Sequence, residues 1–174
     1  MRQADEESFR RFAVDHAVRL RRSAYLLCGD WHFAEDLMQT TLVKIYRSWG
    51  RVQKDESLTN YGRTVLLRTW LDEKRRPWRR SEQTEAAVPE QHDDARGPGD
   101  SPERLWARDL VHAGLLRLPP RQRAVLVLRY FDDLSVAEAA RVMGCSEGTV
   151  KSQTARGLDS LRTSVSQLAG RVAS

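Results

Sequence analysis

Small polar and basic side chains recur at helical spacing near the C-terminal end of the sequence. They are Ser146, Thr149, Lys151, Ser152, Gln153 and Arg156. Spacings of three and four residues place Thr149, Gln153 and Arg156 on one face of a helix. A glutamine can pair with an adenine edge, an arginine with guanine or phosphate, and a threonine methyl with thymine. Lys151 and Ser146 are better suited to phosphate contacts. This set of side chains therefore predicts recognition of duplex DNA in the major groove.

The residues just before this face predict the elements that must position it. Ser135 and Glu138 are spaced as a capping box, which begins a helix. Small Ala139 and Ala140 allow a second helix to cross closely, residues 143–145 form the turn, and Ser146 caps the second helix. This order of parts is typical of a DNA-binding helix-turn-helix. The alternative is an ordinary surface helix in an all-α domain.

A second basic segment, "RTWLDEKRRPWRR", covers residues 68–80 and contains six basic and two acidic side chains. Trp70 and Trp78 are interleaved with the basic residues, a combination that suits a single strand of nucleic acid, since aromatic rings stack on exposed bases. The spacing of Trp70 with Leu66 instead favours a place in the core. Lys74, Arg75 and Arg76 have the alternative of being merely a solvated cluster.

Apolar periodicity predicts helices throughout and no convincing pair of strands. We expect helices over residues 5–27, 31–49 and 61–76, with Asn60 as the cap of the third. A further helix begins after Ser101, where proline follows a capping residue. "RQRAVLVLRYF" is expected to be a short helix, with a strand as the alternative. The fold class is therefore all-α.

Residues 81–101 separate two helical regions and differ from both in composition. Residues 82–103 contain seven acidic side chains and one basic one, while the whole chain has a net charge of +5. With two prolines and two glycines in residues 81–101, we expect a flexible linker there. The predicted organisation is a domain over residues 1–80, a linker over 81–101 and a domain over 102–170.

Composition argues against several other classes of protein. Two cysteines far apart do not form a disulfide framework, and no run approaches the roughly 18 apolar residues of a membrane span. Cys28 and His32 lack the paired spacing of zinc ligands, and we find no constellation of catalytic residues. We expect a soluble, cytoplasmic protein without catalytic residues, metal or cofactor.

Two blocks of sequence resemble a known family. "LPPRQRAVLVLRYFDDLSVAEAARVMGCSEGTVKSQTARGLDSLR" (Leu118–Arg162) is similar to the C-terminal domain of extracytoplasmic-function sigma factors of the sigma-70 family. A second block, Ala24–Val52, is similar to their N-terminal domain; it reads "AYLLCGDWHFAEDLMQTTLVKIYRSWGRV". The sequence motifs in the two blocks most resemble those of the actinobacterial SigE-like subgroup.

The resemblance implies a subunit that binds core RNA polymerase and directs it to promoter DNA, without catalysing a reaction itself. The N-terminal domain would bind polymerase and melt the −10 element, and the helix-turn-helix would read the −35 element. The family's polymerase-binding segment corresponds to Glu35, Asp36, Gln39 and Thr40, with Thr40 replacing the usual glutamate. The alternative to polymerase binding for Glu35 and Asp36 is that they are solvent-exposed acids in the first turn of a helix, where the helix dipole favours negative charge.

The segment that captures a flipped −10 base corresponds to residues 50–59, in or beside which lie Lys54, Asn60 and Arg63. We assign these three residues, together with Lys74, Arg75 and Arg76, to −10 DNA. Many relatives are held inactive by an anti-sigma factor, which is therefore a further partner that the resemblance implies.

Two other functions are compatible with parts of the sequence. A stand-alone helix-turn-helix regulator would share the C-terminal reading face but would dimerise and make no polymerase contact. A pure interaction protein would bind polymerase or an anti-sigma factor without DNA.

Overall fold

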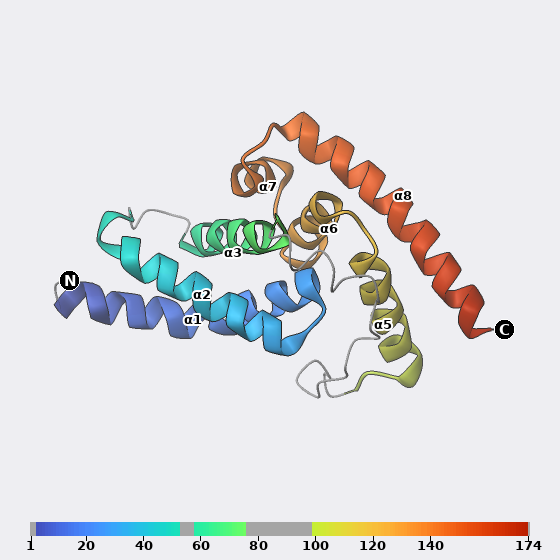
Figure 1. Ribbon diagram of the computed structural model, residues 1–174, viewed down its shortest axis with the longest axis horizontal. Helices are drawn as coiled ribbons and strands as arrows, with labels where there is room; N and C mark the ends of the chain where they lie inside the picture. The colour runs from blue at the N-terminus through green and yellow to red at the C-terminus, as the bar shows by residue number, and fades with distance from the viewer. Residues whose placement is uncertain (1–2, 53–57, 76–98, 174) are drawn as a thin grey trace.

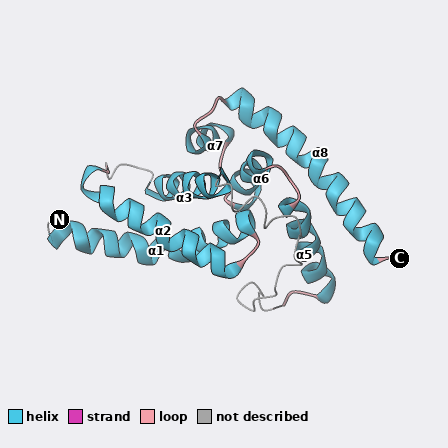
Figure 2. Cartoon of the chain, in the orientation of Figure 1, coloured by secondary structure: helices cyan, strands magenta, loops and turns pink. Residues whose placement is uncertain are grey.

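The computed structural model describes residues 3–52, 58–75 and 99–173, and in these ranges every regular element is helical (Figure 2). The elements are α1 (Gln3–Cys28), α2 (Trp31–Ser48), the 3-10 turn η1 (Trp49–Arg51), α3 (Leu58–Arg75), α5 (Pro102–Leu116), α6 (Pro120–Leu126), the π-helical turn η4 (Val127–Phe131), α7 (Val136–Met143) and α8 (Glu147–Val172). We call α1–α3 the N-terminal half and α5–α8 the C-terminal half. The all-α fold class is confirmed.

The local signals that end and begin the helices are those expected from the sequence. Gly29 has a φ of +77° and ends α1, and the Asp30 carboxylate accepts a hydrogen bond from the Phe33 amide to cap α2. Ser101 caps α5 in the same way through the Arg104 amide. Each cap satisfies an amide that has no partner within its helix.

One expectation about local structure is wrong, and a second is confirmed with a refinement. Asn60 does not cap α3, because the helix already begins at Leu58 and Asn60 lies in its first turn. "RQRAVLVLRYF" is helical, but it is not one uniform α-helix, since η4 continues α6 with π-helical bonding. Wide turns of this kind are rare and occur mostly as single turns within helices.

The two halves pack on each other in the arrangement of Figure 1. The helices α1, α2 and α3 contact one another, and α8 runs along the outer side of α5, α6 and α7. Contacts of α3 with α7, and of α1 with α5, α6 and η4, join the halves. The two chain ends lie far apart along the longest axis of the molecule.

The larger of two hydrophobic core clusters among the described residues extends through both halves, and the smaller one, around Phe12, Ile45 and Trp49, lies within the N-terminal half. The larger cluster includes Leu27 and Trp70 from the N-terminal half and Leu115, Val127 and Val150 from the C-terminal half. Trp70 is fully buried, which confirms its predicted place in the core. Burial of apolar surface is the main favourable contribution to folding, so the two halves stabilise each other in this arrangement.

The expected linker falls mostly outside the described residues. Its last three residues, 99–101, lead directly into α5, and there Asp100 accepts a hydrogen bond of 2.7 Å from Arg108. None of the described helices is long and apolar enough to cross a membrane.

Candidate nucleic-acid and polymerase interfaces

The helix-turn-helix is built by α7, a tight turn and α8. Ser135 and Glu138 form the complete capping box, with Ser135 Oγ accepting from the Glu138 amide and the Glu138 carboxylate accepting from the Ser135 amide. Gly144 follows α7 in the left-handed conformation, with φ +65° and ψ +40°. A glycine adopts this conformation without the steric cost that a side chain would add, so the turn can reverse the chain immediately after Met143.

The first turn of α8 is fixed by its own cap. Ser146 Oγ accepts a hydrogen bond of 3.1 Å from the Thr149 amide and lies 2.9 Å from Thr149 Oγ1. Val150 is fully buried and Gly157 packs against Leu126, so one side of α8 faces the core. The helix is therefore held in one rotation about its axis.

That rotation leaves most of the predicted reading face accessible. Ser146, Lys151, Ser152 and Arg156 are exposed, and Thr149 and Gln153 are half-buried. The structure thus brings five of the six predicted −35 residues onto the first three turns of α8, and the sixth, Ser146, is the cap of that helix. Amide, hydroxyl and guanidinium groups at this spacing can reach successive base pairs and flanking phosphates.

The predicted polymerase-binding residues lie on the outer side of α2. Asp36, Gln39 and Thr40 are exposed, whereas Glu35 is half-buried and forms an ion pair of 3.0 Å with Arg21 of α1. The opposite side of α2 buries Ala34, Leu37, Met38, Thr41 and Ile45. This amphipathic packing leaves the polar edge of α2 on the surface of the molecule.

The residues assigned to −10 DNA are not gathered on one exposed surface. Lys54 and Arg76 lie outside the described residues. Asn60 and Arg63 are near the start of α3, and Lys74 and Arg75 are at its end, about 20 Å away at the rise of an α-helix. Arg75 is exposed.

Lys74 is partly drawn into the junction between the halves. Its Nζ lies 5.8 Å from the centre of the Trp70 ring, and burial, with a smaller effect of Arg123, lowers its pKa to about 8. A lysine with this environment remains mostly protonated at neutral pH, and its ammonium group is already in contact with an aromatic ring.

Arg63 is covered by the C-terminal half, and Asn60 beside it is half-buried. The Arg63 side chain is 9% exposed, and its Nε lies 3.5 Å from the Asp132 carboxylate, which follows η4. Arg63 also donates a hydrogen bond of 3.0 Å to Asn60 Oδ1. Sequence reasoning missed Asp132, since an aspartate in a predicted loop carries no signal of burial.

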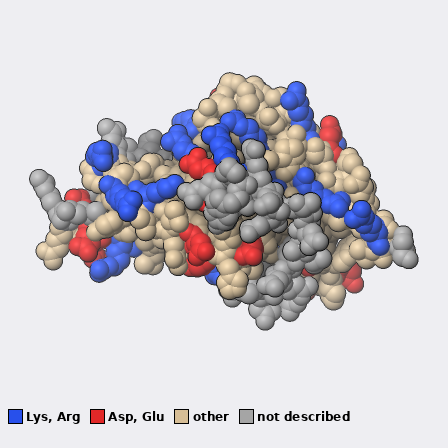
Figure 3. Space-filling model, viewed as in Figure 1, with Lys and Arg blue, Asp and Glu red and all other residues tan. Residues whose placement is uncertain are grey.

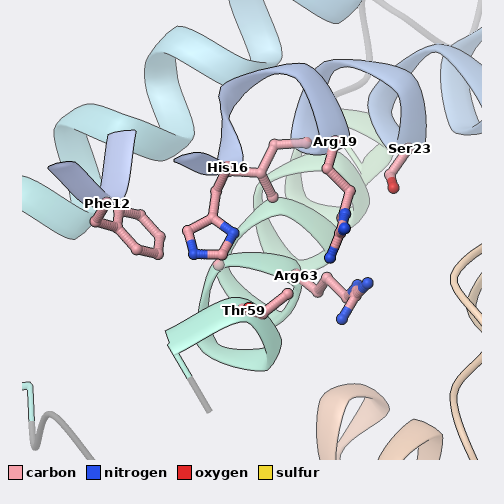
Figure 4. A pocket seen from close by; sticks show the side chains of 8 residues that line it. Phe12, His16, Arg19, Ser23, Thr59 and Arg63 are labelled. Atoms are coloured by element: carbon pink, nitrogen blue, oxygen red, sulfur yellow. The ribbon is translucent and has the colours of Figure 1, made fainter. Parts of the chain in front are cut away.

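Beside Arg63 lies a pocket between α1 and α3, lined among others by His16, Arg19, Ser23 and Thr59. Figure 4 shows the Arg19 and Arg63 side chains reaching toward the same region from the two helices. Burial, and then the charge of Arg19, lower the pKa of His16. Arg19 and Arg63 thus bring two positive charges to this pocket, with Asp15 near His16 and Asp132 beside Arg63 as nearby acids.

Charged side chains on the face seen in Figure 3 are spread over both halves, with basic and acidic groups interspersed. No group of three or more His, Cys, Asp or Glu side chains suited to a metal ion occurs in the part of the chain that the structure describes. Both cysteines are free thiols, and burial raises the pKa of Cys28 to about 11, which leaves it unreactive.

Comparison with known proteins decides the family. The family model described as Sigma-70 region 2 matches residues 12–80, and Sigma-70, region 4 matches residues 108–161. The RNA polymerase sigma-E factor of Streptomyces avermitilis is 38% identical over 143 residues, which cover 82% of this chain and 76% of that protein. The chain belongs to the extracytoplasmic-function sigma factors.

A second relative, the RNA polymerase sigma-E factor of Streptomyces antibioticus, is 36% identical over 85% of this chain and 82% of that protein. A solved structure with the same fold is that of the sigma factor RpoE in complex with the anti-sigma factor NepR from Bartonella quintana. The TM-score is 0.73 and the sequence identity 22%, and the match covers 92% of this chain and 98% of that chain. The expected family and its SigE-like relatives are thus confirmed, and the protein is an RNA polymerase sigma factor.

Proposed function

We propose that this sigma factor binds core polymerase through the outer edge of α2 and reads the −35 element with the first three turns of α8. The observation that carries the proposal is the separation of the two surfaces. The polar edge of α2 and the reading face of α8 belong to different halves and are both accessible. A factor that tethers a polymerase to DNA needs two such surfaces.

The division of the chain into residues 1–80, 81–101 and 102–170 stays a prediction. Recognition of the −10 element is also a prediction, and we assign it to Lys54, Asn60, Arg63, Lys74, Arg75 and Arg76. Support for the −10 assignment comes from the positive charge of five of these six residues and from the position of Asn60, Arg63, Lys74 and Arg75 on α3. Linking two modest DNA contacts through one protein makes the second contact effectively intramolecular, so neither needs high affinity alone.

We further propose that the protein recognises promoter DNA and catalyses no reaction. We also propose that it works in the cytoplasm, where polymerase and the chromosome are. An anti-sigma factor is a proposed partner, because the RpoE structure with the same fold is a complex with one.

The test is in vitro transcription with purified core polymerase on a library of promoter fragments. We expect the wild-type protein to start transcription at defined sites. Replacing Asp36 and Gln39 together by alanine should reduce both core binding and transcription at least tenfold, because both side chains belong to the proposed interface; a tenfold loss corresponds to about 1.4 kcal/mol of binding free energy. Glu7→Ala removes an acid that is 59% exposed at the far end of α1 and serves as the control.

Circular dichroism establishes that the variants remain folded. Full transcription by the Asp36 and Gln39 variant would contradict the assignment of α2. Tight, specific binding of a dimer to duplex DNA without polymerase would favour the stand-alone regulator instead.

A further inference from the structure

Lys74, near the end of α3, lies in an environment unlike that of the other described lysines. The sequence has four lysines, Lys44, Lys54, Lys74 and Lys151. Lys44 and Lys151 are exposed, Lys74 is half-buried, and Lys54 lies outside the described residues. The Lys74 Nζ lies 5.8 Å from the centre of the Trp70 ring, and that ring is fully buried. The amine of Lys74 is therefore partly removed from water.

A second cation approaches the same ring. The Arg123 guanidinium of α6 lies 5.5 Å from the centre of the Trp70 ring, and the Arg123 residue is 5% exposed. The guanidinium is held in place by hydrogen bonds that it donates to three backbone carbonyls, those of Leu27, Leu116 and Leu118. Burial lowers the pKa of Arg123 only to about 10, so it keeps its charge at neutral pH. A fixed positive charge therefore lies close to the Lys74 amine.

No acidic side chain of the described residues balances these two cations. Asp72 and Glu73 precede Lys74 on α3, but side chains one or two positions apart on a helix do not face each other. The described groups whose charge acts on Lys74 are Arg123 and the Cys28 thiol of α1. Burial raises the pKa of Cys28 to about 11, so this thiol carries no charge at neutral pH.

Burial and a neighbouring positive charge both favour the neutral amine over the ammonium ion. Burial is the larger effect on Lys74 and Arg123 adds to it, and together they lower its pKa to about 8. At pH 7.5 about a quarter of the Lys74 amines are then neutral, compared with about one in a thousand for an ordinary lysine. The neutral amine has the free electron pair of a nucleophile, and enzymes activate lysines in the same two ways.

The charge around Lys74 also favours one kind of reagent. Arg75 is exposed directly beside it, so this end of α3 carries several positive charges. A positive field raises the local concentration of anions. An acyl phosphate is an anion with an activated carbonyl carbon, and it therefore suits this amine both by its charge and by its reactivity.

We propose that Lys74 is a site of acylation, at which its amine takes an acyl group from an acyl phosphate. The nitrogen forms a bond to the carbonyl carbon, and the bond between that carbon and the phosphate oxygen breaks. Inorganic phosphate leaves with the electron pair of that bond and takes up the proton that the nitrogen loses. The product is an uncharged amide, so acylation removes the repulsion between Lys74 and Arg123.

The lysines of one protein provide the comparison that tests this proposal. Wild-type protein is incubated with acetyl phosphate at pH 7.5, and acetylation of each lysine is followed over time by peptide mass spectrometry. We expect Lys74 to be acetylated at least tenfold faster than the exposed Lys151. The rate at Lys74 should level off above about pH 8, whereas the rate at Lys151 should continue to rise, since ordinary lysines have a pKa of about 10.4.

The same reaction in urea, at a concentration that unfolds the protein, shows whether the fold is responsible. Unfolding removes both the burial and the fixed position of Arg123, so Lys74 and Lys151 should then react at similar rates. Equal rates at the two lysines in the folded protein overturn the proposal. An undiminished preference for Lys74 in urea also overturns it, because the neighbouring residues in the sequence would then be the cause.

Two matched variants provide an independent measurement. Lys74→Arg and Lys151→Arg keep the positive charge and remove the amine, and the intact mass after a short incubation reports the total acetylation. Lys74→Arg should lose most of the early acetylation and Lys151→Arg little of it. If circular dichroism shows that Lys74→Arg is unfolded, the rates of the individual lysines in wild type decide the question alone.

Transcription separates this inference from the proposed function. A neutral amide cannot pair with a phosphate, so acetylation of Lys74 should lower promoter-specific transcription if Lys74 contacts −10 DNA as proposed. Unchanged transcription by the acetylated protein would count against that assignment and leave the modification site standing. The mapping of acetylation needs neither polymerase nor DNA, so its result holds whether or not the protein starts transcription.

Discussion

At the scale of single residues, the proposed reading of DNA by α8 can be tested one side chain at a time, and Arg156 is an example. It is exposed on α8, about one helical turn beyond Gln153 and away from the side that buries Val150 and Gly157. An arginine in this place can bind guanine through two hydrogen bonds, each such pair contributing about 1–3 kcal/mol of discrimination.

Arg156→Ala should therefore reduce promoter-specific transcription in vitro by roughly 5- to 150-fold and relax sequence preference within the −35 element. Arg162→Ala removes the same charge from the same helix, where Arg162 is exposed and paired with Asp159, and should change transcription little. An equal loss in both variants would show that overall charge, and not base recognition, is responsible.

At the scale of the element, the helix-turn-helix depends on its caps. The capping box of Ser135 and Glu138 begins α7, and the cap of Ser146 begins α8 at the far side of the turn. The two caps fix where each helix starts and so the angle at which α8 leaves the domain. We therefore expect the proposed reading by α8 to depend on these capping residues as well as on the reading face itself.

Ser135→Ala should lower the free energy of unfolding by about 1 kcal/mol, because it leaves the Glu138 amide without its side-chain acceptor. Urea titration followed by circular dichroism measures the change. Ser166→Ala, on the exposed side of α8, is the control and should be neutral or slightly stabilising, since alanine favours helix interiors. No difference between the two variants would mean that the capping box does not stabilise α7.

At the scale of the whole molecule, the buried His112 of α5 contacts α1. We expect this contact to make the stability of the protein depend on pH. The His112 Nε2 lies 3.2 Å from the Tyr25 carbonyl of α1 and the His112 ring 4.6 Å from the Tyr25 ring. Because a carbonyl only accepts, Nε2 must carry the proton of the neutral ring. Burial lowers the pKa of His112, although the hydrogen bond to Tyr25 opposes this.

A histidine whose pKa is lowered on folding binds more protons when unfolded, so its contribution to stability is lost as pH falls below about 6.5. We expect wild type to be less stable at pH 5.5 than at pH 7.5, and His112→Gln to lose less stability over that range. His16 acts in the same direction and Asp132 in the opposite one, since its pKa is raised. The difference between wild type and His112→Gln isolates His112.

Urea titrations at the two pH values measure this, with the exposed His32→Gln as the matched control. If His112→Gln and wild type lose equal stability on acidification, the junction contains no such pH-dependent contact.

Local signals in the sequence determined the helices, their caps and the reading face of α8. Those features depend on side chains within a few positions of one another, as with Asp30 and Phe33 or Ser146 and Thr149. The family followed from the order of two such blocks. The expectation that Asn60 caps α3 was wrong, because asparagine is common at helix caps but can also lie within the first turn of a helix.

Only the tertiary structure decided that the two halves share one core and that Asp132 meets Arg63. These partners are separated by 69 positions, and neither periodicity nor composition specifies which distant side chain fills a buried site. Burial changes what a charged residue can contact. The sequence predicts that Arg63 contacts DNA, whereas in the folded chain Arg63 lies against Asp132 of the other half. That pairing depends on the complete three-dimensional packing, which no local pattern encodes.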